Sequence, residues 1–144
     1  MAFRDSPELI SITVLNVKEL QLLNAMIFPV SYSDKFYKDV VNEKSFSRIV
    51  VLGGNVVGGV CCRVEKNSAT QQHVVYIMTL ACLCQYRRKG IGSIMLNHIL
   101  TTSLLDPTIV AITLHMKIDN EEALSFYKKF GFVVKETAPA YYKV

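Results

Sequence analysis

The chain has 144 residues, 51% of them hydrophobic, and its 16 Lys and Arg against 12 Asp and Glu give a formal charge of +4. This length predicts one domain with a single core, over residues 5–144. No run reaches the ~20 apolar residues of a membrane span, and the first residues lack the apolar stretch of a secretion signal, so we expect a soluble intracellular protein without membrane contact. The basic residues form no long blocks with interleaved aromatics, which favours a small anionic ligand over direct nucleic-acid binding.

The first part of the chain predicts a strand and a helix. Residues 9–15 are rich in β-branched side chains, which are typical of a strand. Asn16 and Glu19 have the spacing of a capping box, so a helix is expected from there to about Met26. It must end near Pro29, because the residue before a proline is pushed towards extended geometry.

The middle of the chain predicts a short helix followed by an antiparallel meander. Ser33 or Asp34 can cap a helix that reaches Lys44. Three apolar, β-branched runs follow, and Gly-Gly-Asn at residues 53–55 is good chemistry for the turn between the first two. The expected strands are residues 47–52, 56–64 and 73–81.

The last part of the chain alternates helices and strands. Apolar residues at helical spacing predict a helix over residues 91–104, and Asn120 caps a further helix that Gly131 ends. The expected strands are residues 109–117, 132–136 and 141–144. This order predicts an α/β fold whose central mixed sheet has about seven strands and is flanked by about four helices. Ligands of such folds bind where adjacent parallel strands separate.

The glycine loop Tyr-Arg-Arg-Lys-Gly-Ile-Gly-Ser, at residues 86–93, lies at that place. Gly90 and Gly92 let a ligand approach the backbone closely, and the first amides of the following helix have no intrahelical partners. The helix dipole and the charges of the neighbouring Arg and Lys residues favour an anionic group there. The sequence therefore predicts a phosphate site, although a solvated basic turn would have the same composition.

Two better-known glycine loops do not match. A nucleoside-triphosphate loop requires Gly-Lys-Ser or Gly-Lys-Thr, and here Ser93 follows Gly92 directly. A dinucleotide loop requires a third glycine where this chain has Met95. The remaining pattern, Arg-x-x-Gly-x-Gly, resembles the pyrophosphate loop of the GCN5-related N-acetyltransferases (GNAT), which bind acetyl-coenzyme A.

A second block, residues 120–132, is similar to the Asn-x-x-Ala-x-x-Phe-Tyr-x-x-x-Gly-Phe motif of the same superfamily and follows the loop by about thirty residues. Segments 28–37, 76–80 and 141–143 further resemble the NatE-type, or San-type, protein N-terminal acetyltransferases, and the likeness extends over residues 9–143. That family acetylates the α-amine of proteins that begin with Met and a hydrophobic residue. Some members are also reported to acetylate lysine side chains.

The resemblance implies three catalytic residues. An α-amine with a pKa near 8 is mostly protonated at neutral pH, so a base must remove a proton, directly or through a water. The matching Tyr76 and His115 are expected to share this role, and Tyr127 to protonate or stabilise the leaving thiolate. The backbone amide of Leu80 is a candidate donor to the thioester oxygen. From spacing alone, the three side chains could equally be a cross-strand aromatic, a core histidine and a packed core tyrosine.

The resemblance also implies two sets of binding residues. For acetyl-coenzyme A, with coenzyme A as product, they are Leu80, Ala81, Cys82, Leu83, Arg87, Arg88, Lys89, Gly90, Ile91, Gly92, Ser93, Asn120 and Tyr127. For the protein or peptide N-terminus, they are Phe28, Pro29, Val30, Tyr32, Met78, Tyr141 and Tyr142. The backbone of residues 80–83 would pair with the pantetheine arm, and the rings and the methionine suit an unbranched apolar side chain.

The cysteines predict no metal site. Cys61 and Cys62 are adjacent on a strand and therefore point to opposite faces, and Cys82-x-Cys84 lacks the usual spacing of zinc ligands. All four are expected to be reduced and to lie in or near the core.

Two alternatives remain open at this stage. The acceptor could be a lysine side chain, or the chain could be a weakly active scaffold of a ribosome-associated acetyltransferase complex. A NatA-type complex and the ribosome are the partners that the resemblance implies, and the cytoplasm, with the nucleus as a second compartment, is the expected location. The chain departs from the family at Ala81 and at Cys84-Gln85, where members have Gly and Ala-Pro, and it ends at Val144.

Overall fold

The computed structural model describes residues 6–42, 45–87, 90–117, 119–138 and 141–143, and it confirms the predicted α/β fold with a mixed sheet. The strand order is β1-β2-β3-β4-β5-β7-β6. Neighbouring strands run antiparallel, except for β4 and β5, which are parallel. The strands are β1 (Glu8–Ser11), β2 (Arg48–Leu52), β3 (Asn55–Asn67), β4 (Gln72–Cys82), β5 (Ile109–Lys117), β6 (Glu136–Ala138) and β7 (Tyr141–Lys143).

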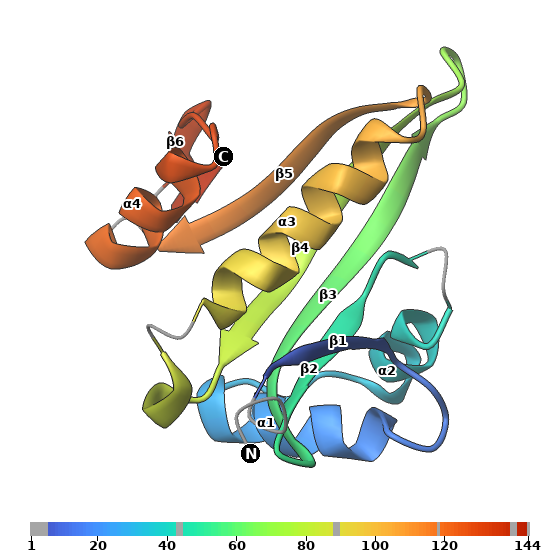
Figure 1. Cartoon of the computed structure of the whole chain (residues 1–144). Coiled ribbons are helices and arrows are strands. Elements are labelled where there is room, and N and C mark those ends of the chain that lie inside the picture. Colours follow the sequence, from blue (N-terminus) through green and yellow to red (C-terminus); the bar gives the residue numbers. More distant parts are fainter. Residues whose placement is uncertain (1–5, 43–44, 88–89, 118, 139–140, 144) are drawn as a thin grey trace.

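Helices pack on both faces of this sheet (Figure 1). Helix α3 (Ile91–Leu104) lies along β3 and β4 on one face, and α1 (Val17–Ile27) and α2 (Asp34–Val40) cover the other. Helix α4 (Glu121–Lys129) lies near the end of β5. No helix in the described ranges is both long and apolar enough to cross a membrane.

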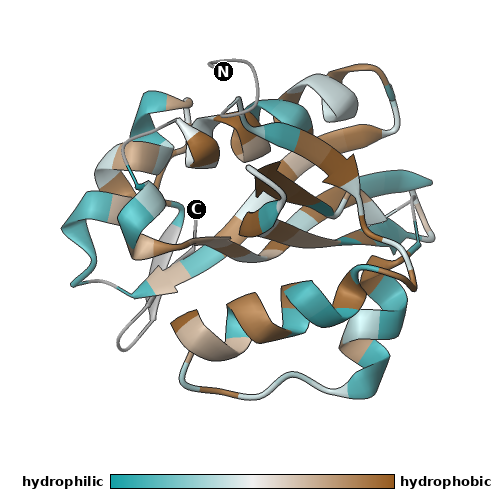
Figure 2. Cartoon of the chain, turned by 60° about the horizontal axis from the view of Figure 1, so that its bottom comes forward, coloured by the Kyte–Doolittle hydropathy of each residue, from teal (hydrophilic) through white to brown (hydrophobic). Residues whose placement is uncertain are grey.

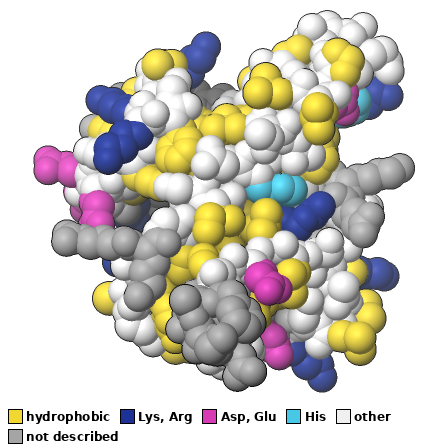
Figure 3. Space-filling view, in the orientation of Figure 1, with side chains coloured by type: hydrophobic (Ala, Val, Ile, Leu, Met, Phe, Trp, Pro, Cys, Tyr) yellow, Lys and Arg dark blue, Asp and Glu magenta, His cyan; other side chains and the backbone are white. Residues whose placement is uncertain are grey.

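The apolar residues are concentrated in the central strands, which are largely brown in Figure 2, and in the helices that pack on them. One buried cluster joins the sheet to α3 and α4, and a second joins it to α1 and α2. Cys62 belongs to the first cluster and Cys61 to the second, as expected for adjacent strand residues. On the face that carries α3, the basic side chains stand mainly towards the edges of the molecule (Figure 3).

Two consecutive glycines in β3 bring a helix close to each face of the sheet. A Cβ on Gly58 would lie 2.8 Å from Ile91 Cγ2 on α3, and a Cβ on Gly59 would lie 2.7 Å from Leu20 Cδ1 on α1. Real Cβ atoms do not approach other atoms so closely, so a larger residue at either position would displace the helix side chain that it meets. The first turn of α3 is thereby seated directly on β3.

A bulge in β4 opens the sheet at its centre. Cys61 pairs with Thr79 and Cys62 with Ile77, so Met78 is an extra residue in β4. The pairing of β4 with β5 ends at Ile77 and Leu114. Beyond this point the two parallel strands diverge, as Figure 1 shows, and the ends of both strands border an opening in the sheet.

The first strand is shorter than predicted, and the capping box is wrong. Strand β1 ends at Ser11, because the chain turns at residues 13–16. The Asn16 side chain accepts a hydrogen bond from the Thr13 amide at 2.8 Å and donates one to the Ser11 carbonyl at 3.1 Å, and it makes no cap bond to α1. An Asn before a helix can close a preceding turn as readily as it caps the helix.

Two other boundaries also differ from the predictions. Helix α2 ends at Val40 rather than Lys44, although Ser33 caps it as expected by accepting from the Phe36 amide. The strand predicted for residues 132–136 begins only at Glu136. Instead, the Phe132 amide donates to the Tyr127 carbonyl, and the Gly131 amide to that of Lys128, as in a Schellman motif.

Candidate active site

A cavity of about 690 Å³ lies between the start of α3 and α4, at the diverging end of β4. Most of the expected cofactor residues in the described ranges line it, together with six that were not predicted to bind the cofactor. The lining residues are Leu80, Cys82, Tyr86, Arg87, Gly90, Ile91, Gly92, Ser93, Asn120, Glu122, Ala123, Ser125, Phe126, Tyr127 and Lys129.

The glycine loop forms one wall of this cavity. Gly90 precedes α3 with φ of 78°, a left-handed conformation that favours glycine, and no side chain caps the helix. Arg87 is exposed and lines the cavity, whereas Arg88 and Lys89 lie outside the described residues. An uncapped N-terminus beside an arginine is a suitable place for a phosphate group.

Helix α4 forms the opposite wall. The Asn120 side chain caps α4 by accepting from the Ala123 amide at 3.1 Å. Glu121 and Glu122 lie in the first turn, and lysines lie in the last turn, so the charges complement the helix dipole. This cap and the Schellman motif fix both ends of the helix.

Tyr127 lies on the inner side of α4 and is buried, with 8% of its surface exposed. Its ring makes edge contacts with Phe126 and Phe132 at centroid distances of 5.3 and 5.6 Å. Burial, and after it the nearby Cys62 thiol, raise the pKa of Tyr127 to about 12. The phenol therefore remains protonated at neutral pH and can donate a proton or a hydrogen bond within the cavity.

Tyr76 and His115 meet on the other face of the sheet, where β4 and β5 part. The Tyr76 hydroxyl lies 2.9 Å from His115 Nδ1, and the two rings are 5.5 Å apart at an interplanar angle of 70°. Their strand neighbours Ile77 and Leu114 belong to the cluster under α3, so the pair points the opposite way. Tyr76 is half-buried and His115 is exposed, so an acceptor can reach them.

An aromatic cluster of Phe28, Tyr32 and Phe36 lies on the same face as this pair. Phe28 and Tyr32 meet edge to face at 6.2 Å, and Tyr32 stacks on Phe36 at 4.5 Å. Met78 packs against the same cluster, whereas Val30 is 57% exposed at the surface. Burial, followed by the neighbouring Tyr37, raises the pKa of Tyr32, so its hydroxyl stays protonated. Pro29 is exposed as well.

Strand β7 brings the two C-terminal tyrosines next to β5. Tyr142 pairs with Met116 and Tyr141 with Lys117, one and two positions beyond His115. The side chains of both tyrosines lie outside the described part of the structure, so only their backbone is placed beside β5.

Some expected cofactor residues do not line the cavity with their side chains. Ala81 is buried in the cluster under α1, on the other face of β4. The Leu83 side chain packs against both clusters, and its amide donates to the Val57 carbonyl. Ala81 and Leu83 can therefore contact the cofactor only through backbone groups, which is the role predicted for residues 80–83.

Several residues of the site were not predicted to take part in it. Phe126 belongs to the 120–132 motif, and Glu122 and Lys129 recur with it at helical spacing on α4, so extending the motif around the helix could have found them. Phe36 stacks on Tyr32 four positions before it and could have been found by extending the acceptor residues along segment 28–37.

The thiols at the cavity differ in their surroundings. Cys61 and Cys62 are buried and Cys82 is half-buried in the cavity wall, but Cys84 is exposed, unlike the prediction that all four lie in or near the core. Burial raises the pKa of Cys82, and the charge of Arg87 opposes this shift. In the described residues, no group of three His, Cys, Asp or Glu side chains is arranged to hold a metal ion.

Comparison with known proteins agrees with this geometry. Residues 16–132 match the model of the acetyltransferase (GNAT) family. N-alpha-acetyltransferase 50 of Danio rerio is 49% identical over 136 residues, which are 94% of this chain and 80% of that protein. The probable N-acetyltransferase san of Drosophila melanogaster is 45% identical over 140 residues, 97% of this chain and 75% of that protein.

A solved structure has the same arrangement of elements. Arabidopsis thaliana Naa50 in complex with the bisubstrate analogue CoA-Ac-MVNAL is 36% identical and superposes with a TM-score of 0.86, covering 96% of both chains. The family model, the identity of these relatives and the shared fold lead to one conclusion. The chain belongs to the GNAT acetyltransferase family and, within it, to the group that contains N-alpha-acetyltransferase 50 and San.

Proposed function

We propose that this protein transfers the acetyl group of acetyl-coenzyme A to the α-amine of peptides that begin with Met and a hydrophobic residue. The observation that carries the proposal is the 2.9 Å contact between Tyr76 and His115, at the opening between β4 and β5. The cavity beside the start of α3 lies on one side of this opening and the aromatic cluster on the other. A cofactor and a peptide can therefore meet between the strands.

Acetyl-coenzyme A supplies an acetyl group activated as a thioester. Backbone groups of residues 80–83 and the side chain of Asn120 would hold its pantetheine arm. The loop residues Arg87 to Ser93, including Arg88 and Lys89, would hold the pyrophosphate. The uncapped start of α3 and the left-handed Gly90 support this assignment, because they expose amides to an anionic group. The Leu80 amide is the proposed donor to the thioester oxygen.

Tyr76 and His115 together serve as the base. The α-amine is mostly protonated at neutral pH and must lose a proton before it can attack. When the Tyr76 hydroxyl donates to His115 Nδ1, the phenolic oxygen can accept a proton from the amine, directly or through a water. The histidine ring is suited to the proton because one of its nitrogens can accept a proton while the other donates one.

Tyr127 serves the leaving group. Its raised pKa keeps the hydroxyl protonated, so it can stabilise the departing thiolate by donating a hydrogen bond to the sulfur. A phenol with this pKa is a weaker acid than a thiol, so the thiolate leaves hydrogen-bonded and takes its proton from solvent. Its buried position on α4, between the cavity and the core, supports this role.

The acceptor pocket would select the first side chain of the peptide. Phe28, Tyr32 and Met78 offer soft apolar contacts to a methionine, with Pro29 and Val30 at the rim, and Tyr141 and Tyr142 approach from β7. The similar Arabidopsis Naa50 binds the analogue CoA-Ac-MVNAL, which supports a peptide that begins with Met and an apolar residue.

The proposal extends to partners and location. An α-amine is first accessible when a nascent chain leaves the ribosome, which supports a NatA-type complex at the ribosome as partner and the cytoplasm, with the nucleus as a second compartment. Co-sedimentation of the tagged protein with ribosomes, with and without an RNase treatment, tests this part.

The decisive experiment compares two peptides with acetyl-coenzyme A. One begins Met-Leu with a free α-amine and contains no lysine, and the other has a blocked α-amine and an internal lysine. Transfer to the first peptide only, lost in a His115→Ala variant that still binds coenzyme A, is the expected result. Transfer mainly to lysine would replace the proposal with a lysine acetyltransferase, and binding without transfer would indicate a scaffold.

A further inference from the structure

Arg63 on β3 lies directly beside the proposed base. It pairs with Tyr76 across the β3–β4 ladder, so both side chains stand on the same face of the sheet. The guanidinium carbon of Arg63 is 5.2 Å from the centroid of the Tyr76 ring, within the range of a cation–π contact. Sequence motifs do not single out this arginine.

Glu65 holds Arg63 in this place. Its Oε2 accepts from Arg63 Nε at 3.1 Å and from Nη2 at 2.8 Å. Two hydrogen bonds from different guanidinium nitrogens to one carboxylate oxygen restrict the orientation of the guanidinium more than a single hydrogen bond would. Glu65 lies two positions along the same strand and therefore on the same face as Arg63 and Tyr76.

The position of Tyr76 explains why its ring needs a fixed neighbour. The next residue, Ile77, is the last that pairs with β5, and the bulge at Met78 follows. The β5 side therefore opens just beyond the ring, and the β3 side carries Arg63. A contact from β3 onto the ring restrains rotation that would move the hydroxyl away from His115 Nδ1.

We propose that Arg63, held by Glu65, is a positioning residue that keeps the Tyr76 ring aimed at His115. This inference rests on the proposed function, because it concerns the same Tyr76–His115 base. Arg63 acts through Tyr76 and does not touch the cofactor. A competing explanation is that the two charges merely form an exposed pair, since their side chains are 57% and 49% exposed and such pairs contribute little to stability.

Steady-state kinetics on the Met-Leu peptide test the proposal. Arg63→Ala is expected to lower kcat roughly fivefold, because an exposed cation–π contact and the orientation it provides are of that size, with KM for both substrates unchanged. Arg63→Lys should recover most of the loss, because an ammonium group can also lie over the ring. The kcat of Glu65→Ala should lie between that of the wild type and that of Arg63→Ala.

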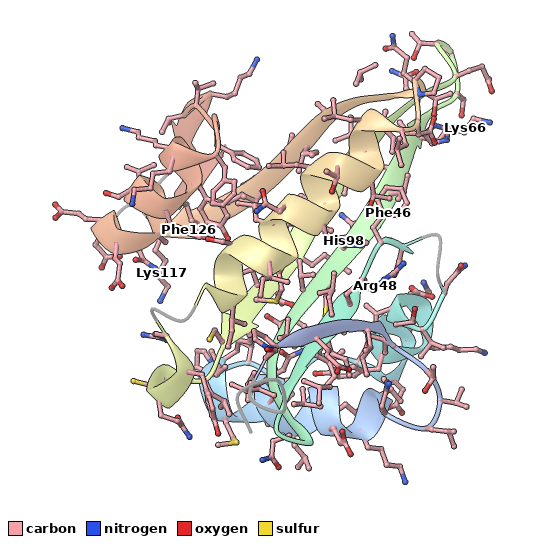
Figure 4. The ribbon with its side chains drawn as sticks, viewed as in Figure 1. Phe46, Arg48, Lys66, His98, Lys117 and Phe126 are labelled. Atoms are coloured by element: carbon pink, nitrogen blue, oxygen red, sulfur yellow. The ribbon has the colours of Figure 1, made fainter. Side chains whose placement is uncertain are left out.

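Lys66→Ala is the matched control. It removes one positive charge from the same strand, but Lys66 pairs with His73 and faces the other side of the sheet, near the far end of the hairpin (Figure 4). It should keep the wild-type kcat. Thermal unfolding of all variants shows whether a loss of rate reflects a loss of folding.

A double-mutant cycle separates positioning from other roles. In the Tyr76→Phe background the hydroxyl is gone, so adding Arg63→Ala should change kcat by less than about twofold. The positioning role would be overturned if Arg63→Ala lowered kcat fivefold in the Tyr76→Phe background as well. It would also be overturned if Arg63→Ala changed only the KM for the peptide. If the wild type transfers no acetyl group to the peptide, the proposed function fails, and this inference fails with it.

Discussion

The Phe126 ring of α4 lies against Gly92 of α3, so that a Cβ on residue 92 would be 3.2 Å from Phe126 Cζ. Gly92 lies within α3, and its φ is not in the left-handed region. Glycine is therefore needed there for space and not for backbone conformation. This contact joins the two walls of the cofactor cavity at the loop that is proposed to hold the pyrophosphate.

A Gly92→Ala substitution should weaken coenzyme A binding without unfolding the protein. Alanine is favoured over glycine within a helix by up to about 1 kcal/mol, which offsets the tight contact with Phe126. We expect a Kd for coenzyme A roughly tenfold higher by titration calorimetry, because the first turn of α3 must shift. Gly92→Ala combined with Phe126→Leu should recover part of the affinity, and an unchanged Kd in the single variant would contradict the expectation.

Tyr127→Phe should lower kcat roughly tenfold to a hundredfold, because the departing thiolate loses its hydrogen-bond donor while the ring keeps its packing. The pKa of about 12 also predicts that Tyr127 causes no alkaline loss of wild-type activity below pH 10. The measurement is a pH–rate profile of both proteins, with circular dichroism as the folding control. A variant with wild-type kcat would remove Tyr127 from the mechanism.

Gly58→Ala and Gly59→Ala should both destabilise the protein, by about 1–3 kcal/mol each in urea unfolding, since each added methyl overpacks a helix contact. Only Gly58→Ala should also raise the Kd for coenzyme A, because it displaces Ile91, which lines the cavity. The Gly59 variant, which pushes on α1, is the matched control. Equal effects on binding would show that the loss is global and does not arise at the cavity.

His98 should make stability depend on pH. His98 and Arg48 lie close together on the α3 side (Figure 4), and burial, followed by the charge of Arg48, lowers the pKa of His98 below its ordinary value of 6.5. The unfolded chain then binds more protons than the folded one just below pH 6.5. The free energy of unfolding therefore falls as the pH drops through that value, by at most about 1.4 kcal/mol per pH unit.

Urea unfolding of the wild type and of His98→Gln between pH 5 and 8 measures this contribution. The two curves should run parallel above pH 7, and the wild type alone should show the extra decline below 6.5. An identical slope in both proteins would exclude His98 as its source.

Elements fixed by local chemistry could be predicted from the sequence. The Asn120 cap, the stop at Gly131 and the start of α3 directly after Gly90 each depend on a few consecutive residues, and the structure has all three. Asn16 shows the limit of such patterns, since the same Asn-x-x-Glu spacing serves a turn. A local pattern identifies the groups that can form hydrogen bonds, but it does not determine which partners they bond to in the folded protein.

The site was only partly predictable, because its geometry depends on contacts between distant segments. The likeness to known motifs singled out Tyr76 and His115, which lie 39 positions apart and meet in the structure. The contact of Phe126 with Gly92 and of Arg63 with Tyr76 had no signal, since neither pair is local. The bulge at Met78 could not be predicted either. Strand β4 is apolar on both faces, so its sequence has no alternation of apolar and polar residues that a bulge would break.

That bulge decides which face of the sheet each side chain of β4 reaches. Tyr76 and Leu80 are four positions apart and would share a face in a regular strand, but the extra residue turns Tyr76 towards the acceptor side and Leu80 towards the cofactor cavity. Deleting Met78 would leave the two groups three positions apart, and therefore still on opposite faces of a strand without a bulge. A sequence that keeps every residue of β4 but pairs it regularly with β3 would bring both groups to one side, and would keep the fold's outline without its chemistry.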